Sequence, residues 1–304
     1  CTYSEIRRYS YVQASDWSWA VLLADFDLNG YNDILVTNGL LQDITNLDYI
    51  QEINNPDMIR SIISDQDLDF TQLIDMIPTN PVPNVLFANN GDLNFEEKAE
   101  AWGIGEPGFS SGAVWADLDG DGDLDLVIND VDGPVKIYRN RARQAYPERG
   151  SLKLTLTGSS PNTFAIGAQI EAWAGDQYWF REHFLQRGYQ SSVEPGIFIG
   201  TGSQSTIDSL RVVWPDGSTS ALTDISLPAS LSLNQSEASV SQEPIDFSRP
   251  SFLPGDVETG SSQSSSAPLL TDITERIGLN WEHQRFEYND FNRELLLLHM
   301  RSSE

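Results

Sequence analysis

Short apolar segments alternate with polar segments rich in aspartate and glycine along the first half of the chain. One pattern occurs twice, in residues 18–39 and 110–133: an apolar run, an acidic loop and a second apolar run. Aligning Asp25 with Asp117 brings the acidic positions of both copies into register. Apolar runs this short, next to Asp/Gly-rich loops, predict buried β-strands rather than helices. Further strands are expected at Asn84–Ala88 and Val135–Tyr138.

The segment between the two copies, residues 40–83, has another character. Its apolar residues recur at helical spacing and the run ends at Pro78, which predicts a short helical insertion that packs on the sheet. The positions that carry this pattern are Met58, Ile59, Ile62, Ile63, Phe70, Leu73, Ile74 and Ile77.

In residues 151–236, apolar and polar positions alternate at Leu152, Leu154 and Leu156 and again from Ile166 to Ala174. Several such strands, with a strong turn at Pro215–Gly217, predict an antiparallel β-sandwich. Residues 237–268 are rich in proline and serine and are expected to form a linker. The following LTDITERIGL resembles FEEKAEAWGI at 95–104, so residues 269–304 are expected to begin a second repeat region. The predicted fold class is all-β.

Composition narrows the function. The chain has 304 residues, with 45 acidic and 18 basic side chains, a net charge of −27 and a pI near 4.2. Phosphate backbones and anionic lipids would repel such a chain, which argues against nucleic-acid partners and polybasic membrane docking. The single cysteine allows no internal disulfide. No apolar run approaches the roughly 20 residues of a transmembrane helix, so no transmembrane segment is expected.

The acidic loops carry the clearest chemistry. Each places oxygen-bearing side chains at positions 1, 3, 5 and 9, without Cys or His nearby, and backbone carbonyls at position 7 are expected to contribute. Hard oxygen donors favour Ca²⁺ over zinc or copper, and Mg²⁺ ranks second because it demands tighter geometry. Two Ca²⁺ sites are therefore predicted. Their ligands are Asp25, Asp27, Asn29, Tyr31 (backbone) and Asp33 in the first, and Asp117, Asp119, Asp121, Asp123 (backbone) and Asp125 in the second.

These loops do not match an EF-hand. That motif needs Glu at position 12 followed by a helix, but position 12 is Val36 in the first loop and Ile128 in the second. The alternative to metal binding is a pair of solvated acidic turns, which the repetition in one frame disfavours. A third cluster, Asp65, Asp67 and Asp69, lacks glycine and is interpreted as a solvated face.

The other candidate binding and catalytic residues are better explained by structural roles. Five tryptophans could stack on sugar rings, but large aromatic residues in sheet proteins usually belong to the core. His183 has no partner in a recognisable nucleophile motif, and no catalytic residues are predicted. The tryptophans are Trp17, Trp19, Trp115, Trp173 and Trp179.

The two loops and their flanking strands resemble FG-GAP/VCBS repeats, the calcium-binding blades of integrin-type β-propellers. The middle segment resembles an ASPIC/UnbV domain, as in cartilage-acidic-protein-like proteins and large surface proteins of Bacteroidota. The residues that carry this second resemblance are Asn162, Gly167-Ala168, Gly188-Tyr189, Phe198–Gly202 and Val213–Gly217.

The resemblance implies an architecture. It comprises a partial β-propeller at 1–145 with the helical insertion at about 40–83, an ASPIC/UnbV sandwich at 151–236, the linker at 237–268, and new repeats from 269. A propeller of this family has more blades than the two visible, so the chain is expected to be a fragment of a longer protein. Asn29, in place of an aspartate, implies a weaker first site. Cys1 could be a lipidated N-terminus, but the chain is expected simply to start there, because the sequence after it soon enters a repeat that is already under way.

Two functions follow as hypotheses. The first is a non-catalytic, calcium-binding scaffold or binding module at the cell surface, with a protein or glycan partner. The second is a calcium-dependent component that captures or processes glycans in an outer-membrane uptake system. Calcium is plentiful outside the cytosol, so an extracellular or cell-surface location is expected, associated with the outer membrane if the protein is bacterial.

Overall fold

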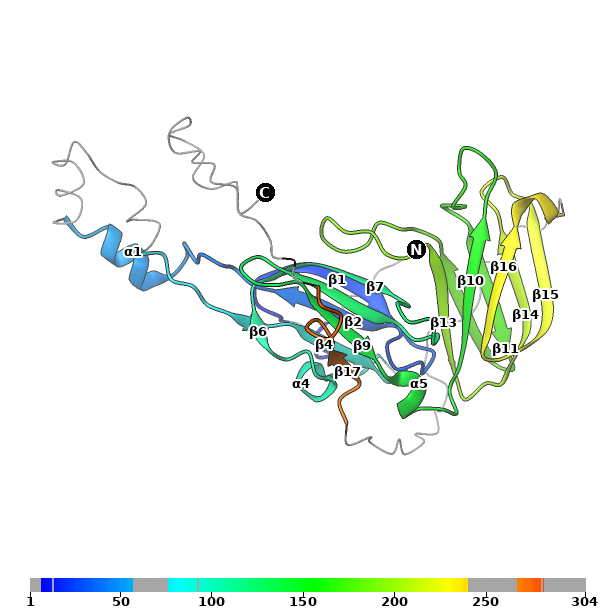
Figure 1. The fold of residues 1–304 in the computed structure, drawn as a ribbon, viewed down its shortest axis with the longest axis horizontal. Helices are drawn as coiled ribbons and strands as arrows, with labels where there is room; N and C mark the ends of the chain where they lie inside the picture. Colours follow the sequence, from blue (N-terminus) through cyan, green and yellow to red (C-terminus); the bar gives the residue numbers. More distant parts are fainter. Residues whose placement is uncertain are drawn as a thin grey trace.

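The computed structural model describes residues 7–12, 14–56, 76–91, 93–239, 267–279 and 281. β-strands dominate this part of the chain and the helices are few and short, which confirms the all-β class. Two four-stranded sheets occupy the middle of the molecule and a region built from two further sheets lies beside them, with the helix α1 (Leu47–Ile53) at the opposite end (Figure 1).

The first four-stranded sheet is an antiparallel meander in chain order. It consists of β1 (Ser18–Ala24), β2 (Asp33–Asn38), β4 (Val85–Asn89) and β5 (Phe95–Glu97). Alternate residues of β1 are buried, as expected for a strand with one face on a core. The short helix α4 (Ala99–Trp102) follows β5 and ends at Gly103 in the left-handed conformation that glycine favours.

The second sheet repeats the first, with β7 (Ser110–Ala116), β8 (Asp125–Asp130), β9 (Lys136–Asn140) and β17 (Leu270–Asp272). The pairing of β7 with β8 reproduces that of β1 with β2, residue for residue: Ala24 lies opposite Asp33, and Ala116 lies opposite Asp125. Both pairs even carry a bulge at the same place, after Ser18 and after Ser110. The sequence repeat is therefore a repeat in three dimensions.

The strand β17 corrects one expectation from the sequence. The sequence predicts that residues 269–304 begin a second repeat region, but Leu270–Asp272 pairs with β9 and is the fourth strand of the second sheet. Its resemblance to residues 95–104 has a structural basis, because β17 takes the place that β5 takes in the first sheet. The side chain of Asp272 accepts a hydrogen bond from the Thr274 backbone N–H, as that of Glu97 does from Ala99. Residues 282–304 lie outside the described part of the chain.

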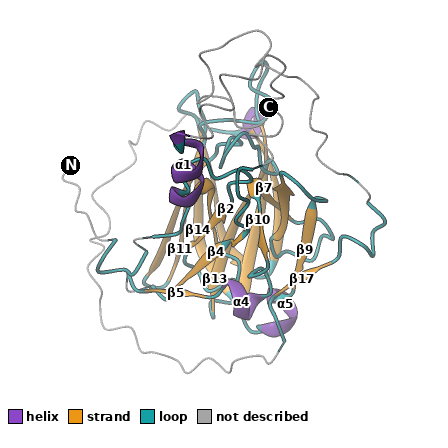
Figure 2. Ribbon diagram, turned by 90° about the vertical axis from the view of Figure 1, so that its left-hand side faces the viewer, coloured by secondary structure: helices purple, strands orange, loops and turns teal. Residues whose placement is uncertain are grey.

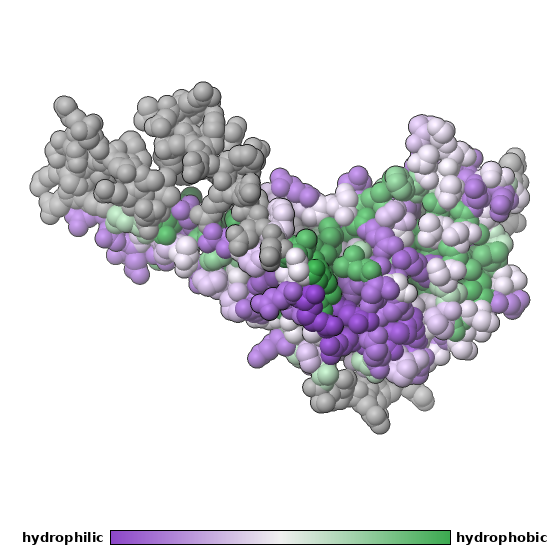
Figure 3. Space-filling view, in the orientation of Figure 1, coloured by the Kyte–Doolittle hydropathy of each residue, from purple (hydrophilic) through white to green (hydrophobic). Residues whose placement is uncertain are grey.

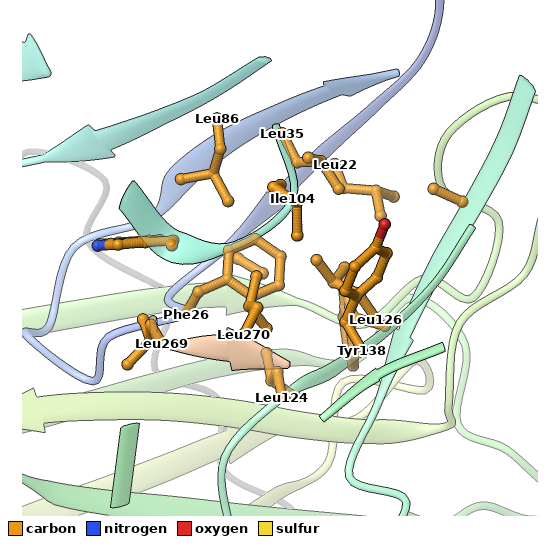
Figure 4. Packing of buried hydrophobic residues seen from close by; sticks show 14 of the residues in the cluster. Leu22, Phe26, Leu35, Leu86, Ile104, Leu124, Leu126, Tyr138, Leu269 and Leu270 are labelled. Atoms are coloured by element: carbon orange, nitrogen blue, oxygen red, sulfur yellow. The ribbon is translucent and has the colours of Figure 1, made fainter. Parts of the chain in front are cut away.

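One hydrophobic core joins the two four-stranded sheets. Apolar side chains from both sheets, from the segment after α4 and from the residues around β17 meet in it (Figure 4). Phe26 and Tyr138 are its largest fully buried members, and the pair Leu269 and Leu270 closes one side. The chain thus returns after more than a hundred residues to complete this core.

The chain between β9 and β17 forms the two-sheet region, Gly150–Ser239. A three-stranded sheet in the order β13-β10-β16 and a four-stranded sheet in the order β12-β11-β14-β15 contribute to one shared core. β10 pairs antiparallel with β13 and parallel with β16. The strands are β10 (Gly150–Thr157), β11 (Gln169–Ala174), β12 (Gln177–Glu182), β13 (Gly196–Gly202), β14 (Thr206–Val213), β15 (Thr219–Ser226) and β16 (Ala229–Asn234).

The remaining elements are short. β3 (Val82–Pro83) pairs with β6 (Pro107–Gly108), α5 (Ala142–Ala145) leads from β9 to β10, and a 3₁₀ turn (Gln235–Glu237) follows β16. Figure 2 shows the strands gathered in the middle of the molecule, with α4 and α5 at one end.

Several expectations are only partly tested. α1 lies within the expected helical insertion. Residues 57–75, which carry most of the apolar pattern of that insertion, lie outside the described residues. Residues 240–266, which make up most of the expected linker, also lie outside them. No sheet closes on itself in the described ranges. None of the helices described is both long and apolar enough to span a bilayer.

If β17 belongs to the core of the second sheet, Leu270→Ala should destabilise the whole protein. Leu270 is fully buried, so this truncation should cost about 2–5 kcal/mol of unfolding free energy in denaturant titration. Leu279→Ala, in the same segment but 44% exposed, serves as the control and should change stability by less than about 0.5 kcal/mol. Equal stability of the two variants would show that β17 is dispensable.

Candidate metal centre

Each acidic loop joins the first two strands of one of the two four-stranded sheets that share a core. Loop 1 (Asp25–Asp33) lies between β1 and β2, and loop 2 (Asp117–Asp125) lies between β7 and β8. Their backbones turn in the same way. Leu28 and Gly120, at position 4, have φ of 62° and 76°, and Gly30 and Gly122, at position 6, have 98° and 90°. Glycine takes these angles without strain, which explains its place at position 6 of both loops.

The aspartate at position 9 fixes each loop to the sheet. Asp33 accepts hydrogen bonds from the backbone N–H groups of Phe26 (2.9 Å) and Asn89 (2.8 Å). Asp125 accepts the matching pair, from Leu118 (2.9 Å) and Asn140 (2.8 Å). Both asparagines end the third strand of their sheet, so each carboxylate links its own loop to that third strand.

In loop 1, three carboxylates converge. Asp25, Asp27 and Asp33 are 6%, 8% and 0% exposed, and each offers an oxygen within 4.8 Å of the others. Asn29 Oδ1 accepts from the Tyr31 N–H at 2.8 Å, as Asp121 Oδ1 accepts from the Asp123 N–H in loop 2, and the Asn29 amide donates to the Asn89 carbonyl at 2.9 Å. Among the acidic side chains of loop 1, those at positions 1, 3 and 9 converge.

In loop 2, the convergent carboxylates are Asp117, Asp119 and Asp121, at positions 1, 3 and 5. The side chains of Asp119 and Asp121 are 34% and 20% exposed, whereas that of Asp117 is 2% exposed. Asp123 and Asp125 are buried; Asp123 accepts from the Arg143 N–H at 2.9 Å through Oδ2, while its Oδ1 is buried without a hydrogen-bond partner. The participation of the Tyr31 and Asp123 carbonyls stays a prediction.

Burial leaves several of these carboxylates poorly compensated. Desolvation, together with the charge of Asp27, raises the pKa of Asp25 to about 8, and the same two causes and Asp25 raise the pKa of Asp33. Burial also raises the pKa of Asp123 to about 8 and that of Asp125 to about 6. In Asp121, burial acts in the same direction but hydrogen bonds outweigh it and lower the pKa.

The donor set suits a hard divalent cation. The convergent acidic side chains are all carboxylates, several of them buried and repelling one another, and a cation of charge +2 would remove this repulsion. Asp25, Asp27 and Asp33 could hold such an ion in loop 1, and Asp117, Asp119 and Asp121 could do so in loop 2.

Loop 1 lies directly against the two-sheet region. The Trp179 indole N–H donates to the Gly30 carbonyl at 3.0 Å, and the Gly202 N–H donates to the Leu28 carbonyl at 3.1 Å. The Arg149 guanidinium contacts the Asp27 carboxylate at 2.9 Å. Contact is so close at Gly200 that a Cβ there would overlap the Asp25 carboxylate.

Loop 2 touches the same region. The Lys153 ammonium, on β10, lies 3.1 Å from Asp117 Oδ2 and 2.8 Å from Glu194 Oε1. The Asp117 N–H donates to the other Glu194 oxygen at 2.9 Å. Figure 3 shows hydrophilic side chains gathered around β9 and α5, next to the two-sheet region. Both acidic loops therefore lie at the junction between the four-stranded sheets and the two-sheet region.

Sequence reasoning missed the basic residues at this junction: Arg139, Arg149 and Lys153 carry no motif. Asn89 and Asn140 could have been found from the sequence, because each is the last residue of the third strand in its copy of the repeat.

The remaining sequence candidates are placed as follows. Trp115 and Trp179 are buried, Trp19 is half-buried against Tyr189, and Trp17 is 45% exposed. Trp173 is half-buried and contacts Tyr178. His183 is buried, and burial lowers its pKa. The cluster Asp65, Asp67 and Asp69 lies outside the described residues.

Comparison with known families agrees with this organisation. A family model described as an FG-GAP-like repeat matches residues 67–128, which include loop 2, and one described as ASPIC and UnbV matches residues 158–240, within and just beyond the two-sheet region. The comparison with curated proteins found no match. The resemblance inferred from the residues is confirmed.

The raised pKa values predict an unusual pH dependence. Between the unfolded value of 3.8 and the folded values of about 8 for Asp25 and Asp123, the folded chain holds protons that the unfolded chain has lost. Without divalent cations, the unfolding free energy should therefore fall as pH rises through this window. Thermal denaturation in chelator from about pH 5 to pH 8 measures this, and Asp25→Asn should flatten the slope. Stability that rises with pH would contradict the assignment.

Proposed function

Because the chain is an FG-GAP repeat protein with an ASPIC/UnbV domain, we propose that it is a non-catalytic, calcium-binding module of a cell-surface protein. These two families together fit a surface or binding module in general. The observation that carries calcium binding is the convergence of three carboxylates in each of two loops with matched backbones and registers.

Calcium suits these loops better than other cations. Ca²⁺ takes six to eight oxygen ligands in flexible geometry, whereas Mg²⁺ demands a near-ideal octahedron. The hydrogen bonds from backbone N–H groups to Asp25, Asp33 and Asp125 hold the carboxylates in place and leave further lone pairs for an ion.

The role of the ion is structural. In loop 1 it would draw together the first two strands of the sheet and hold the surface on which Trp179 and Gly202 dock. The four-stranded sheets would be two blades of a propeller whose other blades come from further chain, and the two-sheet region would be a β-sandwich inserted between the third and fourth strands of the second blade.

The location follows from the ion. Calcium sites fill readily where the ion is abundant, which is outside the cytosol. We place the protein in the extracellular space or on the cell surface, at the outer membrane if it is bacterial, with a protein or glycan as its partner.

Removal of calcium should destabilise the protein. At a Ca²⁺ concentration of 100 times Kd, one site adds about 2.7 kcal/mol to the unfolding free energy, so the melting temperature in excess chelator should be lower by several degrees. Asp27→Asn should abolish most of this difference. Asp176→Asn, an exposed acid outside the loops, should leave it intact. A melting temperature that is the same with calcium and with chelator, with no ion bound in mass or emission spectrometry, would refute calcium binding.

A second candidate function is calcium-dependent glycan capture, which one feature of the two-sheet region favours. Ile170, Ala172 and Ala174 on β11 point into the core, so Glu171 and Trp173 lie on the opposite face. The rings of Trp173 and Tyr178 lie 5.4 Å apart, and Tyr178 donates to Glu171 at 3.1 Å. Aromatic rings beside hydrogen-bonding groups can bind the apolar face of a sugar.

This candidate predicts that Trp173→Ala abolishes binding to neutral polysaccharides, measured by affinity electrophoresis with calcium present. Trp17→Ala is the matched control, because Trp17 is exposed and lies just before β1, outside the two-sheet region. Retardation that is the same for wild type and Trp173→Ala, or absent for every polysaccharide tested, would exclude this platform.

A further inference from the structure

The repeat within this chain allows the two acidic loops to be compared position by position. Asp33 and Asp125 accept corresponding hydrogen bonds from Asn89 and Asn140, so these asparagines match. The residue before each asparagine therefore also matches. It is Ala88 in the first sheet and Arg139 in the second.

Arg139 reaches into loop 2. Its Nη2 lies 2.5 Å from Asp119 Oδ2 and 3.5 Å from Asp121 Oδ2. The Gln144 amide adds a hydrogen bond to the same Asp121 oxygen at 3.1 Å. Two of the three convergent carboxylates of loop 2 are thus contacted by one guanidinium.

Lys153 contacts the third. Its Nζ lies 3.1 Å from Asp117 Oδ2, on a side chain that is only 22% exposed, and it also contacts Glu194 at 2.8 Å. In each convergent carboxylate of loop 2, Oδ1 accepts a hydrogen bond from a backbone N–H group. The other oxygen, Oδ2, contacts a basic side chain. The two cations come from separate strands, β9 and β10.

Loop 1 differs. Within the described ranges, Asp27 is the one convergent carboxylate with an ion pair, to Arg149 at 2.9 Å. Asp25 and Asp33 accept hydrogen bonds from backbone N–H groups. Arg181, whose charge acts on Asp25, donates instead to the Asn32 side chain at 3.0 Å.

From this asymmetry we infer that divalent cations bind preferentially in loop 1. In loop 2, the charged groups of Arg139 and Lys153 already contact the carboxylates, and a divalent ion must displace them to bind. This inference rests on the proposed function. It reverses the order of affinity that Asn29 implied, because in loop 2 two basic side chains contact all three convergent carboxylates, whereas in loop 1 one basic side chain contacts one of them. Since Lys153 also bonds Glu194, ion entry at loop 2 would loosen one contact of the junction.

Isothermal titration of the full chain with Ca²⁺ tests the inference, with Tb³⁺ luminescence as a second probe. Wild type should show one tight site, which Asp25→Asn removes. Arg139→Ala makes loop 2 match Ala88 of the first sheet, and Lys153→Met keeps the aliphatic stem without the charge. In each, a second site should tighten by about tenfold or more, corresponding to about 1.4 kcal/mol. Lys98→Met, which breaks an ion pair away from both loops, should change neither site.

The outcomes separate the two proposals. Two equal sites in wild type, unchanged in Arg139→Ala and Lys153→Met, would overturn the inference while calcium binding stands. One tight site that survives Asp25→Asn would overturn it as well, because the ion would then lie in loop 2. No binding in wild type or in either variant, with native melting curves, would refute both proposals. Should Arg139→Ala not fold, Lys153→Met alone decides, since it leaves β9 unchanged.

Discussion

Repulsion between carboxylates held together at the end of a β-hairpin is the constraint on which this structure depends. The chain curls tightly enough at loop 1 to bring Asp25, Asp27 and Asp33 within 4.8 Å of one another, in surroundings that exclude water. Backbone N–H groups satisfy some of the oxygens but bring no net charge. Charged carboxylates are therefore costly there unless a cation compensates them, and the two loops differ in how much compensation the protein itself supplies.

The same loops decide how the two halves of the molecule meet. Loop 1 presents backbone carbonyls to Trp179 and Gly202, and loop 2 presents Asp117 to Lys153 and Glu194. The chain leaves the second sheet after β9, builds the two-sheet region and returns as β17, so both ends of that region are anchored on one sheet. A change in the charge of either loop would therefore alter the contacts at this junction.

Much of the local structure was predictable because it is encoded by short-range patterns. The matched acidic loops predicted both hairpins, and the alternation of apolar and polar residues around Leu152–Leu156 predicted a strand of the two-sheet region. The place of β17 was not predictable: LTDITERIGL shows what kind of strand it is, but only tertiary contacts such as those of Leu270 show which sheet it joins. Arg139 and Lys153 were missed for the same reason, since isolated basic residues carry no pattern until folding brings them to the acids.

Anomalous diffraction from crystals of the chain grown with calcium, collected at a long wavelength and repeated after exchange to terbium, tests the central claim most directly. The account predicts a strong peak among the carboxylates of Asp25, Asp27 and Asp33, and a weaker peak or none in loop 2, with Arg139 and Lys153 still in contact with its acids. Absence of any peak in loop 1 at saturating calcium, with those three carboxylates well ordered, would contradict it.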